Sequence, residues 1–424
     1  MPYGGNDWLA LTQEPTLEPE ISICDPHHHF WDFRSERIPY QRYLLHELAA
    51  DVNCGHDVRS TVFIEARAMY RPDGPVELRP VGEVEFVQGL AAAAATALYG
   101  PCRAASAIIG HADLKLGDRV EPVLTALQAA SPNRFRGIRH TVTWDPHPEI
   151  ENRETEGVLA TADYRAGARV LARMGFSLDT GVCFPQLPEL AAFAKAVPEL
   201  TIILNHLGGL TRIGPYANRD DEVLPTWRRG IAAVAECPNV NIKLGGIGMP
   251  RLGFDWHTRA RPIGSEELAS SMAPLMGYCI EQFGPNRCMF ESNFPVDKVS
   301  FSHHLLFNAF KRFSKSYSAS ERAALFHDTA AWHIASTRSN GEAGVKMPAF
   351  EKRKIGRSSL EVTALGFGCA TLGGTRIEVT REEAEAIIRA AWSAGVRYID
   401  TAPYYGFGQA ERCVGDAMRS VPRD

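Results

Sequence analysis

The stretch Asp25-Pro26-His27-His28-His29-Phe30-Trp31 follows the apolar residues 21–24 and decides how the rest of the chain is interpreted. Residues two apart on an extended strand point to the same side, so His27 and His29 converge while His28 points away. Two imidazoles at the carboxyl end of a strand can hold a divalent metal, or a carbonyl and a water, over one reacting carbon. A solvated histidine cluster is the alternative. The position inside a strand pattern favours a catalytic pair.

Short apolar runs alternate with helical patterns along most of the remaining chain. Strands are expected at residues 60–65, 105–110, 135–140, 176–183, 200–205, 240–244 and 287–291, and helices at 84–99, 120–130, 164–174, 188–196, 226–237, 268–283 and 302–336. Strict alternation predicts an α/β fold, a parallel (β/α)8 TIM barrel with its active site at the carboxyl ends of the strands. Those ends carry His29, His111, His140, His206 and Asn293.

Composition and net charge limit the classes of binding partner that this chain is expected to have. The chain has 424 residues, of which 45% are hydrophobic and 22% charged, which fits one large globular domain and a smaller one. A formal net charge of -5 argues against nucleic-acid or anionic-membrane surfaces. The first residues lack a secretory pattern, and the nine cysteines form no Cys-x-x-Cys pair, so a cytoplasmic protein with reduced thiols is expected. The expected partner is a small-molecule substrate, and a homo-oligomer is compatible with the sequence.

Changes of sequence style suggest the domain boundaries. Residues 1–20 are expected to be an N-terminal extension and residues 21–336 the barrel. A polar, Gly-containing segment at 337–350 reads as a linker, and 351–424 as a second, partial domain.

Four ordered motifs resemble one known family. They are the histidine stretch at 25–31, Leu204-Asn-His-Leu-Gly-Gly209, Val240-Asn-Ile-Lys-Leu244 and Arg287-Cys-Met-Phe-Glu-Ser-Asn-Phe-Pro-Val296. Together, over about residues 20–335, they resemble the amidohydrolase-related proteins that include sugar lactonases and pyrone-dicarboxylate lactonases. The resemblance implies a barrel that hydrolyses a lactone or a related C–O or C–N bond, with His27, His29 and His206 polarising the carbonyl.

One position departs from that family. An aspartate usually follows the last barrel strand, where this chain has Asn293. An amide cannot accept a proton at neutral pH, although it can orient a water or hold a carbonyl. The base is then a neighbouring carboxylate, Asp297 or Glu291, or a histidine. Asp297 follows Pro295 in an expected loop, where a solvated carboxylate is an equal alternative.

Because Asn293 replaces the usual aspartate, two alternatives exist for metal binding. His27, His29 and His206 as neutral imidazoles would suit one Zn²⁺ with a position free for water. Some relatives hydrolyse lactones without a metal, and the missing carboxylate at Asn293 weakens the metal case. Both alternatives stand.

Three further residues are candidates for substrate binding. Arg139 and His140 end a strand and suit a carboxylate or hydroxyl of the substrate. Lys243 alternates with Asn241 on a strand, and a lysine inside a barrel needs a partner. His303 and His304 begin a helix, where a solvated or capping role is expected.

The last quarter resembles a second family, the start of an aldo-keto reductase. Residues 354–362 look like its opening hairpin and 365–374 like its first strand and cofactor-facing turn. The segment Ile399-Asp-Thr-Ala-Pro-Tyr-Tyr-Gly406 contains the matching catalytic residues, Asp400 and Tyr405. The partner lysine and histidine and most of the NADP phosphate site would follow Asp424. A truncated second (β/α)8 barrel fragment without activity of its own is therefore expected, with NADP bound only by an intact domain.

The leading interpretation is a hydrolase of carbohydrate metabolism that opens a small sugar-derived or dicarboxylate lactone. Because such reductases can oxidise an aldose to a lactone, the fused pair favours a sugar lactone by association. The alternatives are a metal-dependent decarboxylase or amidase on the same barrel, and a barrel lacking catalysis.

Overall fold

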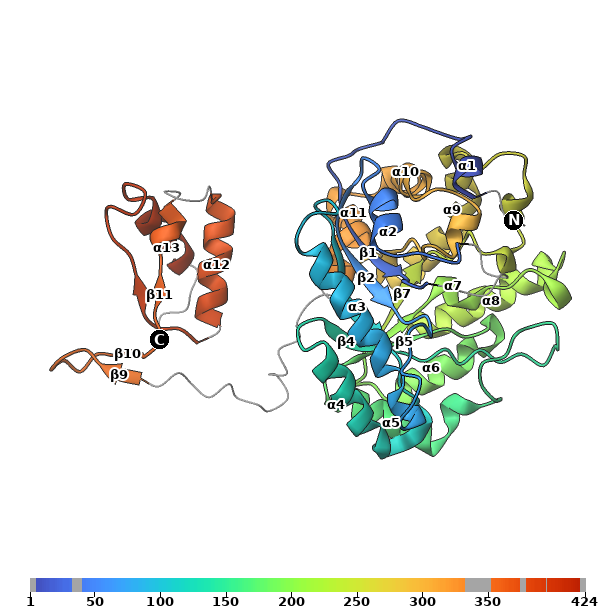
Figure 1. Cartoon of the computed structure of the whole chain (residues 1–424), viewed down its shortest axis with the longest axis horizontal. Helices are drawn as coiled ribbons and strands as arrows, with labels where there is room; N and C mark the ends of the chain where they lie inside the picture. The colour runs from blue at the N-terminus through green and yellow to red at the C-terminus, as the bar shows by residue number, and fades with distance from the viewer. Residues whose placement is uncertain (1–4, 33–39, 332–351, 374–378, 394, 420–424) are drawn as a thin grey trace. The chain divides into compact units, whose positions relative to one another are not determined.

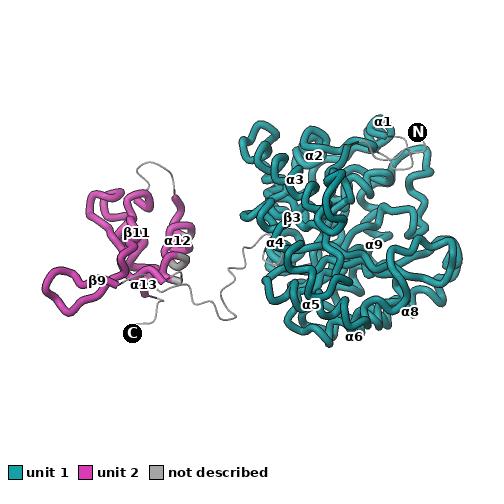
Figure 2. The backbone as a smooth tube through the Cα atoms, turned by 60° about the horizontal axis from the view of Figure 1, so that its bottom comes forward, with its two compact units in different colours: residues 1–338 teal, residues 339–424 magenta. Residues whose placement is uncertain are grey.

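The computed structural model describes residues 5–32, 40–331, 352–373, 379–393 and 395–419. The chain divides into two compact units, Met1–Arg338 and Ser339–Asp424 (Figure 2). Each unit is described by itself.

The first unit is built on eight parallel strands that pair in chain order. They are β1 (Ser22–His28), β2 (Asp57–Ile64), β3 (Arg103–Gly110), β4 (Phe135–Arg139), β5 (Ser177–Thr180), β6 (Ile202–Leu204), β7 (Val240–Leu244) and β8 (Cys288–Phe290). Two backbone hydrogen bonds close the barrel: Asn293 N–H donates to the His27 carbonyl (2.9 Å) and His29 N–H to the Phe294 carbonyl (2.8 Å). The predicted TIM barrel is confirmed for this unit.

Helices surround these strands (Figure 1). They are α1 (Gly5–Leu9), α2 (Leu45–Val52), α3 (Val81–Ala94), α4 (Glu121–Ala130), α5 (Ala162–Arg173), α6 (Leu187–Ala196), α7 (His206–Gly209), α8 (Asp220–Ala235), α9 (Ser265–Phe283), α10 (His303–Phe313) and α11 (Ala319–Ala323). The helical region expected at 302–336 is divided into separate helices over its described residues. Ser318 accepts a hydrogen bond from Glu321 N–H in a capping box, which starts α11 as a separate helix.

Alternate residues of the strands fill two different cores. On β1 and β2, even-numbered apolar residues face the barrel interior and odd-numbered ones face the helices. The small cluster inside the barrel contains Cys24, Val62 and Ile64. The large cluster against the helices contains Ile23 and Phe63. This is the two-sided burial expected of a parallel barrel. Apolar side chains fill the interior, so polar groups that end the strands gather at the mouth.

The second unit is small. Strands β9 (Lys352–Lys354) and β10 (Glu361–Thr363) form the predicted antiparallel hairpin, and β11 (Phe367–Gly368) pairs in parallel with β12 (Ile399–Asp400). Helices α12 (Arg381–Ser393) and α13 (Gln409–Met418) pack on each other around a core of their own. Its origin as part of a second barrel stays a prediction, and the expected linker 337–350 lies outside the described residues.

Among the described residues, no helix combines the length and apolar character needed to cross a membrane.

Candidate active site

A cavity of about 430 Å³ opens at the carboxyl ends of the barrel strands. Its walls come from segments that follow several different strands, as the barrel architecture predicts. The lining includes His29, Trp31, Glu65, Arg67, Arg139, Thr141, Arg153, Asn205, His206, Arg251 and Val296.

The three consecutive histidines face as the strand geometry predicts. The rings of His27 and His29 lie with centroids 4.9 Å apart, whereas His28 Nε2 is hydrogen-bonded to Thr61 Oγ1 at 2.8 Å. His29 donates its Nδ1–H to the Ile64 carbonyl (2.8 Å), which leaves Nε2 as an acceptor in the neutral ring. Burial lowers the pKa of both His27 and His29 well below the usual range, so both rings are neutral.

His206 and Glu291 form a hydrogen-bonded pair beside His27. The Nδ1 of His206 lies 2.7 Å from Oε1 of Glu291, and the centroids of the His206 and His27 rings are 4.6 Å apart. Glu291 is fully buried, while the His206 side chain keeps 15% of its surface exposed and lines the cavity. Because the carboxylate accepts the Nδ1–H, the Nε2 lone pair of a neutral His206 is free.

Two glycines after β7 make room for this pair. A Cβ on Gly245 would lie 2.3 Å from Cγ of Glu291, and a Cβ on Gly246 would lie 2.8 Å from the His206 side chain. Gly246 also has a φ of +67°, which disfavours any larger residue. The turn from β7 therefore sets how closely His206 and Glu291 approach.

The pair also offers a set of metal ligands. Ligand atoms of His27, His206 and Glu291 all lie within 4.8 Å of one another, and His29 is not part of this set. Glu291 Oε2 is 2.8 Å from Nδ1 of His27, yet the direction of approach leaves it without a completed hydrogen bond. A buried carboxylate oxygen without a donor, between two imidazoles, fits a divalent cation.

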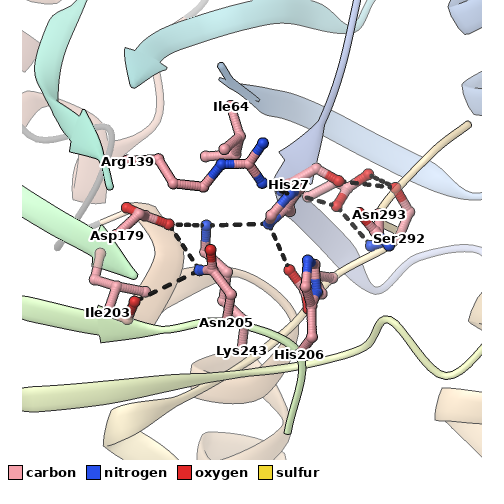
Figure 3. A network of polar contacts seen from close by, with 12 residues as sticks. His27, Ile64, Arg139, Asp179, Ile203, Asn205, His206, Lys243, Ser292 and Asn293 are labelled. Carbon is pink, nitrogen blue, oxygen red and sulfur yellow. Dashed lines mark hydrogen bonds and ion pairs between the residues drawn. The ribbon is translucent and has the colours of Figure 1, made fainter. Parts of the chain in front are cut away.

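Lys243 has the partner that a lysine inside a barrel requires. Its Nζ lies 2.5 Å from Oδ1 of buried Asp179 and 3.5 Å from Nδ1 of His27 (Figure 3). Asn205 also donates to that aspartate oxygen, at 3.0 Å. The ion pair holds positive charge directly behind His27.

Of the two predicted substrate clamps, the structure brings only Arg139 to the cavity. Arg139 Nε donates to Oε1 of Glu65 (2.9 Å), and its Nη1 lies 3.3 Å from Nε2 of His27. His140 points away from the described cavity lining: its Nε2 lies 3.2 Å from Glu154, and its Nδ1 accepts from Leu114 N–H. Successive strand residues face opposite sides, so adjacent residues do not form one clamp.

Asn293 and Asp297 bond to each other beneath the mouth, and neither lines the cavity. Asn293 has a φ of +55° and donates its Nδ2–H to Oδ1 of Asp297 at 2.7 Å. Oδ2 of Asp297 accepts from Gly248 N–H at 2.8 Å. Of the two equal alternatives for Asp297, the solvated loop carboxylate is wrong: Asp297 is fully buried at the start of a 3-10 turn, and burial raises its pKa well above the usual range.

Of the solvated and capping roles expected for His303, the solvated one is also wrong. It is buried against Phe294, with ring centroids 5.4 Å apart, and its Nε2 lies 3.7 Å from Oδ2 of Asp25. Burial works to lower the pKa of His303, but Asp25 and Cys54 together raise it to about 9.

Sequence reasoning missed several residues of the site because no motif marks them. The only sequence signal for Asp179 is Lys243, because a buried lysine needs an acidic partner. The others lie on loops past the strand ends, where the alternation pattern carries no signal. They are Glu65, Arg67, Arg153 and Arg251. In the second unit, Asp400 ends β12 and Tyr405 lies in the turn before α13, and their catalytic roles stay predictions.

Comparison with known proteins covers both units. Residues 24–331 match the amidohydrolase family and residues 364–424 the aldo/keto reductase family. A pyridoxal 4-dehydrogenase of Microbacterium luteolum is 49% identical over 76 residues, which cover 18% of this chain and 22% of the relative. The second unit thus spans about a fifth of that relative's length.

The first unit matches relatives over nearly their whole length. An uncharacterised protein of Sinorhizobium fredii is 30% identical over 74% of this chain and 98% of its own. The L-fucono-1,5-lactonase of Burkholderia multivorans is 26% identical over 72% of this chain and 94% of its own. A zinc-bound amidohydrolase from Burkholderia multivorans has the same fold, with a TM-score of 0.56 and 24% identity over 73% of this chain and 98% of that one. On the strength of the family match along residues 24–331, this chain belongs to the amidohydrolase family and is a hydrolase.

Proposed function

We propose that this chain opens a small lactone ring, with His206 as the general base and Glu291 as the group that orients it. The observation that carries the proposal is the 2.7 Å hydrogen bond from Nδ1 of His206, at the cavity wall, to buried Glu291. The similarity to an L-fucono-1,5-lactonase supports a lactone as the substrate.

His206 would take the proton of the attacking water. Glu291 fixes the tautomer with Nε2 unprotonated and stabilises the imidazolium that forms. The water oxygen bonds to the carbonyl carbon as its proton moves to Nε2. When the ring C–O bond breaks, the imidazolium returns that proton to the departing alkoxide, so acid and alcohol are both formed on one molecule. This assigns the role of base without Asn293 or Asp297.

Arg139 would stabilise the oxyanion. Its guanidinium lines the cavity and is fixed by Glu65, so it is a preorganised charged donor. His29 cannot donate to the carbonyl as the family resemblance implied, since its Nδ1–H is committed to Ile64. Its acceptor Nε2 suits a substrate hydroxyl or the water instead. Burial, together with the charge of Lys243 behind it, lowers the pKa of His27 and keeps the ring neutral.

A metal is compatible with the same residues. His27, His206 and Glu291 would hold one divalent cation, which when bound would acidify water and polarise a carbonyl. The cationic groups of Lys243 and Arg139, within 3.5 Å of His27, oppose it. Elemental analysis, together with activity before and after chelation, distinguishes a metal-dependent from a metal-free enzyme.

The test is turnover of a panel of aldonolactones and carboxylated lactones, followed with a pH indicator. Glu291→Gln keeps an acceptor for His206 but removes the charge, so kcat should fall by about 10²–10⁴-fold without unfolding.

The matched control is His147→Asn. His147 pairs with Asp145 at 2.7 Å, is 42% exposed and does not belong to the described cavity lining, so this change should leave kcat unaltered. Turnover of an amide or a carboxylic acid with none of any lactone would overturn the proposal.

A further inference from the structure

Among the described residues, the cavity walls carry four arginines and one carboxylate. The arginines are Arg67, Arg139, Arg153 and Arg251, and the carboxylate is Glu65. Glu65 is already bound to Arg139, through its Oε1 at 2.9 Å. The remaining positive charge faces a concave, partly desolvated space, which concentrates its field on whatever enters.

Arg251 is the half-buried arginine of this group that has no carboxylate partner among the described residues. It lies in the 3-10 turn Pro250–Leu252 that follows β7, and its Nη2 donates to the Gly209 carbonyl and to Thr211 Oγ1, both at 2.8 Å. Within the described residues, no carboxylate forms an ion pair with it. Burial lowers the pKa of its guanidinium, which records the cost of holding this charge away from water.

The hydrogen bonds of Arg251 fix its plane but use one nitrogen. Its Nε and Nη1 make no hydrogen bond within the described part of the chain, although the residue lines the cavity. A half-buried charge without a counter-ion has lost part of its hydration, and a ligand carboxylate is the group that offsets this loss. A guanidinium also matches a carboxylate geometrically, because two of its N–H groups can donate in parallel.

Arg67 is placed at the same cavity by a constrained loop. It follows β2 with a φ of +56°, and its backbone N–H donates to Oε2 of Glu65 at 3.1 Å, while its exposed side chain forms no ion pair in the described part of the chain. Buried Glu83 of α3 fixes this loop by accepting the N–H groups of Ala66 (2.9 Å) and Ala68 (2.8 Å). Arg153, by contrast, pairs with Glu151, which is exposed at 74%.

We propose that the cavity is specific for a lactone that bears a ring carboxylate, with Arg251 binding that carboxylate and Arg67 attracting the anion at the mouth. This rests on the proposed lactone hydrolysis and decides between its two substrate classes in favour of the acid-bearing one. A neutral sugar lactone would leave the half-buried Arg251 without a counter-ion.

The first experiment measures binding without chemistry. Glutarate is the probe, and its dimethyl ester is the neutral control, both titrated calorimetrically into the full chain. Glutarate should bind and the ester should not, and added salt should weaken glutarate binding. Arg251→Gln should raise the Kd for glutarate about 10- to 100-fold. The Kd of Arg251→Lys for glutarate should lie between those of the wild type and Arg251→Gln. Lysine keeps the positive charge but lacks the two parallel N–H groups of a guanidinium.

Controls separate binding from folding. Arg173→Gln removes an equal charge at a surface site where Arg173 pairs with Glu121, and it should leave the glutarate Kd unchanged. Arg67→Gln lies on an exposed loop and should weaken glutarate binding even if Arg251→Gln proves unfolded by circular dichroism. Equal binding of glutarate and ester, or equal Kd values in wild type, Arg67→Gln and Arg251→Gln, overturns the proposal.

The second experiment compares a lactone carboxylic acid with its methyl ester as substrates. The wild type should prefer the acid in kcat/KM by at least about tenfold, and Arg251→Gln should abolish that preference mainly through KM. Turnover of both lactones without preference refutes the carboxylate subsite and leaves the hydrolase proposal standing. Arg251-dependent glutarate binding without turnover of any lactone refutes the hydrolase proposal and leaves the subsite standing.

Discussion

Buried histidines in this barrel differ in their protonation state because their surroundings differ. His27 and His29 are held neutral by burial, and His303, equally buried, is held protonated by Asp25. Asp25 also accepts the N–H and the hydroxyl of Ser292, at 2.9 and 2.5 Å. It therefore ties β1 to the segment after β8, and the charge on His303 supports that junction.

The raised pKa of His303 predicts a pH-dependent stability. An ordinary histidine has a pKa of 6.5, and in the fold it is about 9. Folding is therefore favoured by the protonated form. Its contribution is complete below pH 6.5 and is lost as the pH rises through 9, by an amount on the order of 3 kcal/mol.

The measurement is the free energy of unfolding in urea of wild type and His303→Gln between pH 6 and 10, limits chosen to bracket both pKa values. Lys311, whose pKa burial lowers to about 8, acts in the opposite direction above that pH. The difference between the two proteins removes this common effect. A difference that stays constant across the range would contradict the assignment of His303.

At the scale of elements, the turn after β7 positions the proposed base. Gly246→Ala places a methyl group 2.8 Å from the His206 side chain at a φ of +67°. The ring must move away from Glu291, so kcat should fall at least about tenfold, with a loss of stability of about 1–3 kcal/mol. Lactone turnover and urea unfolding measure the two effects.

Gly277→Ala is the matched control for this substitution. Gly277 lies inside α9, where an added Cβ meets no atom within 4 Å. Alanine is the better helix former there, so stability should rise by about 0.5–1 kcal/mol with kcat unchanged. If both variants lost activity equally, the turn after β7 would have no special part in placing His206.

The elements themselves were largely predictable from sequence, because both faces of a parallel strand are buried and leave short apolar runs. All seven later strands lie within their predicted segments or overlap them, and the period of two placed His27 and His29 correctly. Helix α2 was missed. It lies between β1 and β2, where the alternation leaves a place for a helix, but it is only eight residues long.

The site was predictable only where a motif marks it. Glu291 was a candidate because it precedes Asn293, but its bond to His206 spans 85 positions and depends on the closure of the barrel. Asp297 and Arg251 follow strands in irregular loops, where hydrophobic pattern does not report which side chains are buried. Tertiary packing alone decides those positions.

At the scale of the whole molecule, the two units have separate cores. The large and small clusters of the barrel contain residues up to Ala330, and the cluster of the second unit runs from Cys369 to Ala417, with none in common. The barrel also pairs all eight of its strands with one another. A chain ending at Arg338 should therefore fold by itself.

We expect this shortened chain to keep the Tm of the barrel transition within about 2 °C and the kcat for lactones within twofold, since its core and cavity are complete. Calorimetry of the full chain should show a second, weaker transition that the shortened chain lacks. The second unit exposes Leu365, Tyr404 and Phe407 and has a core of few residues, so its transition should come first on heating. Loss of the barrel transition on removing residues 339–424 would mean that the second unit stabilises the hydrolase, and the two cores would then not be independent.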